Sequence, residues 1–194
     1  MTGTGMRHPQ SLASLTIVRD DFESPQSSCI RSIALFNVDR CPEYGVRFHM
    51  EHRAFDGDAN RAEIIHGIAA RVAINATLIS LDQCETGNPL GLPATDRGPP
   101  PPTDLQILQR LRPDLDLMPF ECGPDMLDET ATAFSIRRAG PGSSLLTIAR
   151  HAPEEAQILW LTYLWAFARP SQRIFFSAAW QAWREIERAR PLGF

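Results

Sequence analysis

The clearest sheet-like pattern in the chain is the largely apolar segment Ile30–Val38. Two polar residues, Asn37 and Asp39, stand at its end and are one residue apart. Side chains of an extended strand alternate between faces, so these two polar side chains share one face at the end of the strand. The following segment, Val46–His52, alternates apolar and polar residues after a turn with Pro and Gly, which predicts an antiparallel hairpin. Upstream, Ser14–Val18 predicts a short edge strand.

Several further segments have the hydrophobic period of helices with one buried face. Apolar residues recur at intervals of three and four, and Asp, Ser or Pro stands near most of the starts, as is typical of helix N-termini. The predicted helices are Ala59–Ala70, Leu105–Leu111, Pro124–Phe134, Pro153–Phe167 and Ser171–Arg188. Between the first two, Val72–Asn75 predicts a short strand and Ala76–Glu85 the start of a helix. An extended Ala73–Leu81 is the alternative, because its apolar residues are partly β-branched.

These elements predict an α/β (α+β) fold, with a mixed sheet, flanking helices and a C-terminal helical hairpin. The 194 residues are enough to bury a large core without disulfides. Residues 1–13 are expected to form a flexible leader and residues 14–194 a single domain, whose helical pair 153–188 closes over the sheet. The Trp residues of that pair are expected in the core rather than on a base-stacking platform.

The composition narrows the class of protein and its compartment. Four Cys stand far apart without a C-x-x-C pair, as is typical of free thiols in a reducing cytoplasm. The chain shows neither a signal-peptide pattern nor a run of about 18 apolar residues. We therefore expect a cytoplasmic protein with no membrane partner.

The net charge of −4 is unevenly distributed along the chain. Residues 1–133 carry 11 Arg against 19 Asp and Glu, whereas residues 134–194 carry 8 Arg against 4 Glu. An acidic protein is not a general phosphate-binding surface, so any nucleic-acid contact is expected in the C-terminal third. The predicted contacts are Arg137, Arg138 and Arg150.

Four stretches, in chain order, carry a family resemblance. They are Ile33–Arg40 ending in N-V-D-R, Val72–Leu81 reading V-A-I-N-A-T-L-I-S-L, Thr103–Pro113 reading T-D-L-Q-I-L-Q-R-L-R-P, and Arg150–Ala156 reading R-H-A-P-E-E-A. Together they resemble the motifs of the DEDDh 3′–5′ exonucleases, the family of proofreading exonucleases and ribonuclease T, which has a ribonuclease H-like fold. The resemblance implies phosphodiester hydrolysis with Mg²⁺ or Mn²⁺, and a single-stranded nucleic acid or a nucleic-acid 3′ end as partner.

Most of the family's catalytic positions hold other residues in this chain. In the family register, Asn37 replaces the first Asp and Asp39 replaces the Glu. Ile79 replaces the Asp of the second motif, Arg150 the general-base His, and Glu155 the last Asp. Only two carboxylates remain, whereas two-metal hydrolysis needs about four around ions about 3.5–4 Å apart. The resemblance therefore implies an ancestry more firmly than an activity.

Two nearby residues offer substitutes for the missing groups. Asp82 lies one helical turn beyond Ile79 if this segment is helical, and His151 lies one residue from the position of the general base. The resemblance then implies catalytic roles for Asp39, His151 and Glu155, and metal ligation by Asn37, Asp39, Asp82 and Glu155.

The sequence leaves four hypotheses open. The leading one is an exonuclease-like domain with weakened or lost catalysis that binds a nucleic-acid end or a protein partner. The second is an active metal-dependent 3′–5′ exonuclease with rearranged ligands. The third is a non-enzymatic protein that forms a homodimer through its helical pair Pro153–Arg188, because Trp and Phe suit an interface as well as a core. The fourth is another α+β domain in which the order of the motifs is coincidental.

Overall fold

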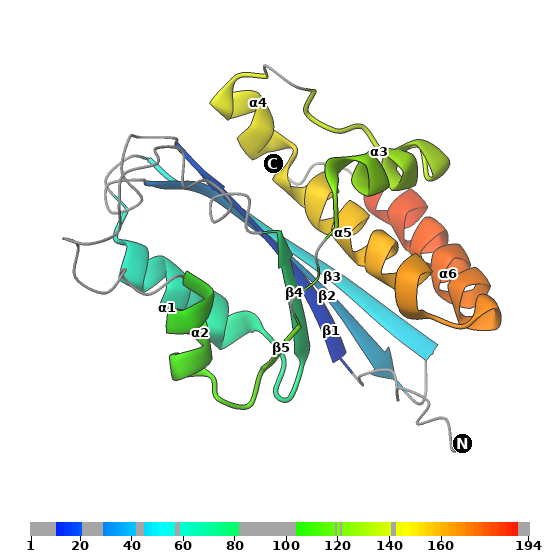
Figure 1. Cartoon of the computed structure of the whole chain (residues 1–194), viewed down its shortest axis with the longest axis horizontal. Coiled ribbons are helices and arrows are strands. Elements are labelled where there is room, and N and C mark those ends of the chain that lie inside the picture. The colour runs from blue at the N-terminus through cyan, green and yellow to red at the C-terminus, as the bar shows by residue number, and fades with distance from the viewer. Residues whose placement is uncertain are drawn as a thin grey trace, which may run out of the picture.

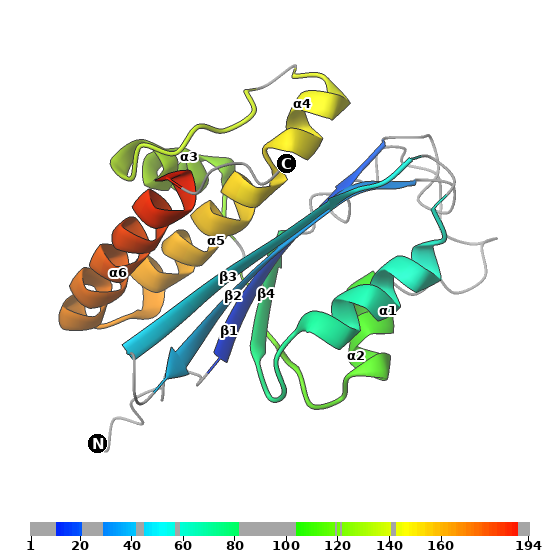
Figure 2. The same cartoon turned by 180° about the vertical axis from the view of Figure 1, so that it is seen from behind.

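A computed structural model describes residues 11–20, 29–41, 45–56, 59–81, 104–118, 120, 122–140 and 143–189. The strands within these residues are β1 (Ser11–Arg19), β2 (Ile30–Cys41), β3 (Gly45–Ala54), β4 (Thr77–Leu81) and β5 (Asp116–Leu117). The helices are α1 (Arg61–Arg71), α2 (Asp104–Leu111), α3 (Pro124–Ala133), α4 (Leu145–Arg150), α5 (Ala152–Phe167) and α6 (Pro170–Ala189). Figures 1 and 2 show α1 and α2 on one side of the sheet and α3 to α6 on the other.

The strands form one mixed sheet in the order β3-β2-β1-β4-β5. β1 pairs antiparallel with β2, and β2 pairs antiparallel with β3. On its other side β1 pairs parallel with β4, which in turn pairs parallel with β5. The predicted mixed α/β sheet with flanking helices is therefore confirmed.

β1 lies in the centre of the sheet, so the prediction of an edge strand at Ser14–Val18 is wrong in position. Leu12 is buried against the helices of one face, whereas Ala13 and Leu15 are buried against those of the other. A strand covered on both faces is apolar along its length, and its parallel partner comes much later in the chain. β1 also begins at Ser11, so the predicted leader of residues 1–13 extends too far, while residues 1–10 lie outside the described part.

β2 and β3 form the predicted antiparallel hairpin, with Cys41 paired to Gly45 at the turn and Ser32 to Ala54 at the far end. Gly45 has φ of 81°, a left-handed conformation that favours glycine. Val46, Phe48 and Met50 alternate with more polar residues along β3, which is the period-two pattern that predicted the strand. Residues 42–44 of the turn lie outside the described part.

The segment Val72–Leu81 runs from a turn into a strand, so the predicted order of strand followed by helix is wrong here. Asn75 has φ of 56°, a left-handed conformation that Asn tolerates, and it turns the chain from α1 towards β4. Thr77 and Ile79 are β-branched and suit the extended backbone of β4. The extended alternative is therefore right for this strand.

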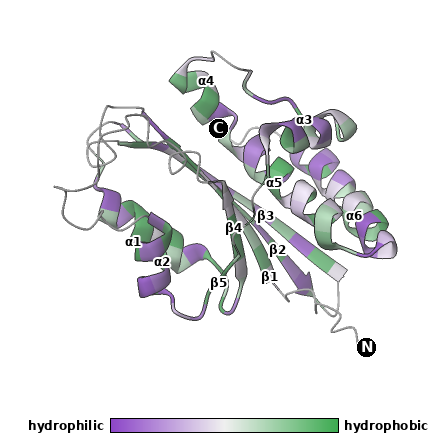
Figure 3. Cartoon of the chain, in the orientation of Figure 1, coloured by the Kyte–Doolittle hydropathy of each residue, from purple (hydrophilic) through white to green (hydrophobic). Residues whose placement is uncertain are grey.

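Two hydrophobic cores lie on opposite faces of the sheet. Along β2, Phe36 and Val38 pack in the core that includes α5, whereas Ile33 and Leu35 pack in the core that includes α1. This alternation is the period-two pattern expected of a strand covered on both faces. Figure 3 shows both apolar and polar residues on the flanking helices, as expected for elements with one buried and one exposed side.

α5 and α6 form the predicted C-terminal helical hairpin over the sheet. Trp160 and Trp180 are buried, and the indole N–H of Trp180 donates to Oε1 of Gln157 at 3.1 Å. Trp183 is half-buried, whereas Trp165 is 47% exposed at the end of α5. The prediction of core Trp residues is confirmed for the first two and is wrong for Trp165.

Arg112 closes the C-terminal end of α1. Its Nη1 donates to the carbonyl oxygens of Ala69 at 2.6 Å and Val72 at 2.9 Å. Its Nε also donates to Oδ1 of Asp114 at 2.8 Å, while Oδ2 of Asp114 accepts from the Asn75 backbone N–H at 3.0 Å. These hydrogen bonds, first those from Arg112, hold the pKa of Asp114 well below its ordinary value of 3.8. We call these contacts of Arg112 and Asp114 the clamp. The clamp joins the end of α1, the turn before β4 and the segment that precedes β5.

Candidate functional site

Asn37 and Asp39 lie at the carboxyl end of β2, and their side chains share one face, as predicted. Because Phe36 and Val38 pack towards α5, strand alternation places the two polar side chains on the opposite face, which α1 covers. Asn37 is 5% exposed, and its Oδ1 has no hydrogen-bond partner among the described residues. Asp39 accepts a hydrogen bond from Oγ of Ser11 on β1.

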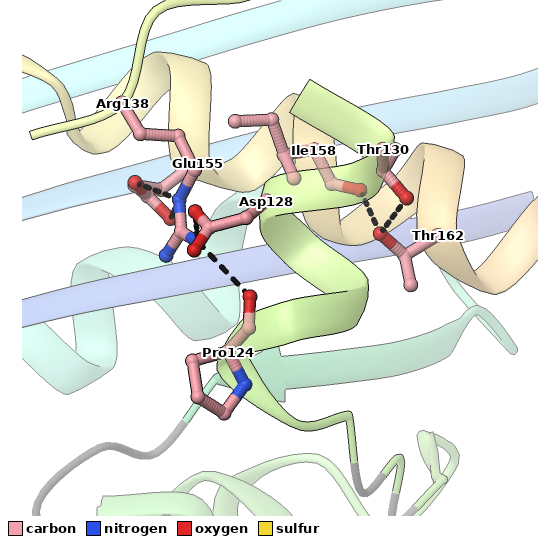
Figure 4. A network of polar contacts seen from close by, with 7 residues as sticks. All are labelled: Pro124, Asp128, Thr130, Arg138, Glu155, Ile158 and Thr162. Carbon is pink, nitrogen blue, oxygen red and sulfur yellow. Dashed lines mark hydrogen bonds and ion pairs between the residues drawn. The ribbon is translucent and has the colours of Figure 1, made fainter. Parts of the chain in front are cut away.

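Glu155 lies in the first turn of α5, where its carboxylate is held by a guanidinium (Figure 4). Nε of Arg138 donates to Oε1 of Glu155 at 2.9 Å and to Oε2 at 3.2 Å. Nη1 of Arg138 donates to Oδ1 of Asp128 at 2.6 Å and lies 3.4 Å from the carbonyl oxygen of Pro124. Burial alone would lower the pKa of Arg138, but the hydrogen bonds and charge of Glu155 raise it above its ordinary value. The carboxylate is thus charge-compensated within the fold.

The three arginines predicted to contact nucleic acid differ in their surroundings. The side chain of Arg138 is only 16% exposed and is engaged with two carboxylates. Arg137 and Arg150 are exposed. The three predicted contacts therefore include one residue, Arg138, with a structural role.

The sheet separates the two retained carboxylates. Oγ of Ser14, on β1, donates to the carbonyl oxygen of Ala156 at 2.7 Å, which fixes the start of α5 on the face that also buries Phe36. Asp39 points to the other face, so Glu155 and Asp39 lie on opposite sides of the strands. Since the ions of a two-metal site lie about 3.5–4 Å apart, these two groups cannot serve one such site.

The remaining predicted groups that the structure describes do not complete the site on either face. Ile79 is fully buried in the core beneath α5, and Asp82 lies outside the described residues. His151 lies between α4 and α5, and its carbonyl oxygen accepts from the Glu155 backbone N–H at 3.0 Å. The structure therefore brings His151 and Glu155 into adjacent positions, away from Asp39.

The described residues do not fit the metal pair that the resemblance implies. Across those ranges, no group of three or more His, Cys, Asp or Glu is arranged to hold a metal ion. Asn37 offers a neutral amide, and Glu155 is already bound by Arg138. We derive no catalytic step through a metal from this arrangement.

Asp104, the first residue of α2, forms a buried ion cluster at the carboxyl end of β1. Its side chain is 1% exposed and contacts the guanidinium of Arg19 on β1. Oδ1 of Asp104 also accepts from Nε of Arg61 on α1 at 2.6 Å. Sequence reasoning missed this cluster, since its members lie far apart and no spacing motif marks them. It ties α2 to β1 and α1, which is a structural role.

A Ser–His pair also occurs where the hairpin meets α4. Oγ of Ser32 lies 2.9 Å from Nε2 of His52 and 3.2 Å from the carbonyl oxygen of Ala149. Ser32 is fully buried, so its hydroxyl has no access to a substrate. We assign the pair to the packing of β2 and β3 against α4.

The outer edge of β3 is the most prominent exposed feature of the described sheet. β3 is the terminal strand, ten residues long, and it is paired on one side only among the described residues. Phe175 of α6 is 51% exposed and lies beside the start of this strand, since its Cζ would be 3.4 Å from a Cβ added at Gly45. We call the free edge of β3 together with Phe175 the β3 edge surface.

Comparison of the sequence with protein-family models and with curated proteins finds no match. None of the described helices combines the length and the apolar character needed to cross a membrane.

Proposed function

We propose that the chain is an exonuclease-like domain of the ribonuclease H-like class that has lost metal-dependent catalysis and serves to bind a protein partner. The observation that carries this proposal is the position of Asp39 and Glu155 on opposite faces of the sheet. The mixed sheet with helices on both faces is compatible with the proposed ancestry.

The chemistry of the retained residues supports the loss of catalysis. Asn37 carries no charge, Ile79 has no ligand atom, and the carboxylate of Glu155 is neutralised by Arg138. Metal ions stabilise the developing charge in phosphodiester hydrolysis by several kcal/mol. A loss of about 4 kcal/mol of this stabilisation lowers the rate of hydrolysis roughly a thousandfold, so little exonuclease activity would remain.

The exposed surfaces favour a protein over a nucleic acid as the partner. Of the three predicted phosphate contacts, Arg138 is engaged with Glu155 and Asp128. By contrast, the β3 edge surface offers backbone donors and acceptors that no described strand pairs with, next to the exposed ring of Phe175. A free strand edge is a template for pairing with another polypeptide.

A nuclease assay tests the catalytic half of this proposal. We expect the purified chain with Mn²⁺ to leave 5′-labelled single-stranded DNA and RNA intact, with no difference between wild type and Asp39→Ala. Asp56→Ala, at an exposed acid outside the predicted ligand set, is the matched control. Laddering of the substrate that is abolished by Asp39→Ala but not by Asp56→Ala would refute the loss of catalysis.

A further inference from the structure

We propose that the β3 edge surface binds a second copy of this chain, so that two β3 strands form an antiparallel ladder across a two-fold axis. The inference rests on the proposed function, because it names the protein partner of a domain that acts by binding. It also differs from the homodimer predicted at the helical pair, because the contact lies at the edge of the sheet.

The backbone of β3 presents on its outer side a regular set of groups that have no strand partner among the described residues. The N–H of Phe55 donates to the carbonyl oxygen of Arg31 at 2.9 Å, in the same register that pairs Ser32 with Ala54. In an antiparallel ladder, residues alternate between bonding one neighbour and bonding the other. The odd-numbered residues of β3 therefore direct their backbone groups to β2, and the even-numbered residues direct theirs outwards.

This edge carries charged side chains, as many protected edges do, but it lacks the other features that prevent strands from pairing. β3 contains no Pro, and its register with β2 runs without a shift from Ala54 to Gly45. Natural edges are commonly shortened, bulged or interrupted by Pro. A ten-residue regular edge is therefore suited to pairing along its whole length.

Charge complementarity favours a second copy of the chain as the partner of β3, and it favours one alignment of the two strands. Because the outward groups belong to even-numbered residues, only registers that pair even with even residues form hydrogen bonds. In the register centred on His49, Arg47 lies opposite the partner's Glu51, and the same pair recurs across the axis. Phe48 lies opposite the partner's Met50 on the other face. Arg47 and Glu51 fall at non-hydrogen-bonded positions, where opposed side chains are closest.

The neighbouring registers lack this complementarity. The smallest shift that keeps even residues opposite even residues is two residues. In one direction it places Arg47 opposite the partner's Arg53, and like charges directly opposite each other are destabilising. A shift the other way places Arg47 opposite the partner's His49 and leaves Glu51 opposite a Gly. Oε2 of Glu51 contacts Nε of Arg71 at 2.6 Å, and Oε1 lies 3.3 Å from Nε2 of His49. The side chain remains 29% exposed, so an arginine of a second copy would add to these two contacts.

Two charge-reversal variants test the register. We expect Arg47→Glu and Glu51→Arg each to raise the dissociation constant of the dimer about tenfold, because each sets like charges opposite each other at two symmetric positions. An equimolar mixture should restore dimers, since the reversed residues are then complementary. Arg53→Glu is the matched control on the same strand and face, and should leave the dimer intact.

Sedimentation velocity at low ionic strength measures these changes, and circular dichroism checks that each variant is folded. Wild-type chain that remains monomeric at every concentration, or a mixture that fails to restore dimers, would overturn the inference. Amide hydrogen exchange gives a second readout that needs no variant. The outward amides of Phe48 and Met50 should become protected as the wild-type concentration rises. The nuclease assay is independent of these results, so failure of the dimer is distinguishable from failure of the proposed function.

Discussion

At the scale of single residues, the two carboxylates that the family resemblance treats as partners have different roles. Asp39 lies near the carboxyl end of β2 and accepts one hydrogen bond from Ser11. Glu155 is 7% exposed and forms two hydrogen bonds with Arg138. Removing a buried carboxylate of this kind would leave a guanidinium without its partner, which is destabilising. We therefore interpret Glu155 as a structural residue.

We expect Glu155→Gln and Arg138→Met each to lower the free energy of unfolding by about 1–3 kcal/mol, because each leaves a largely buried charge without its main partner. The double variant should lose less than the sum of the single losses. Urea unfolding followed by circular dichroism measures all three values.

Asp39→Asn is the control for this cycle. Its amide can still accept from Ser11, so we expect a change within about 0.5 kcal/mol. Strictly additive losses for the Glu155 and Arg138 variants would contradict the assigned ion pair.

At the scale of elements, local periodicity predicted much of the fold, whereas pairing between distant segments could not be predicted. The hairpin of β2 and β3 and the helices α5 and α6 follow from patterns within each segment. The central position of β1 depends on its pairing with β4, which lies beyond β2, β3 and α1 in the chain. β4 itself is short and follows a helix, so its apolar residues suited both a helical and an extended interpretation.

In the candidate site too, patterns within one segment were predictable and contacts between distant segments were not. Period-two alternation correctly placed Asn37 and Asp39 on one face. The face reached by Glu155 depends on which side of the sheet α5 crosses, and α5 is fixed there by Ser14, with which it shares no sequence motif. The pairing of Glu155 with Arg138 likewise joins residues from different elements, and no spacing rule predicts it.

The clamp at the end of α1 gives stability a dependence on pH. The pKa of Asp114 is lowered in the folded protein, chiefly by Arg112, so the unfolded chain binds more protons as the pH falls through the ordinary value of 3.8. The stabilisation is thus fully present above that value and is lost below it. We expect wild type to be more stable than Asp114→Asn at neutral pH, with the gap closing as the solution is acidified.

Urea unfolding at a series of pH values measures this gap. The exposed Asp56→Asn is the control, for which we expect no comparable dependence on pH. A gap between wild type and Asp114→Asn that stays constant through acid pH would show that the clamp does not depend on the charge of Asp114.

At the scale of the whole molecule, the sheet divides the protein into two cores with separate polar groups. One face, which α1 and α2 cover, carries Asn37 and Asp39, and the other, which α3 to α6 cover, carries Glu155 of α5. The free edge of β3 belongs to neither core. A scaffold of this kind can bind a partner along its edge without assembling a catalytic centre, which is the function proposed for this chain.

Titration of the full-length chain with Mn²⁺, followed by isothermal calorimetry, tests this central claim most directly. We expect no saturable binding that depends on both Asp39 and Glu155, so Asp39→Asn and Glu155→Gln should leave the titration of the folded protein unchanged. A saturable site that each of the two substitutions abolishes would show that both carboxylates bind the same metal centre, and would contradict the account.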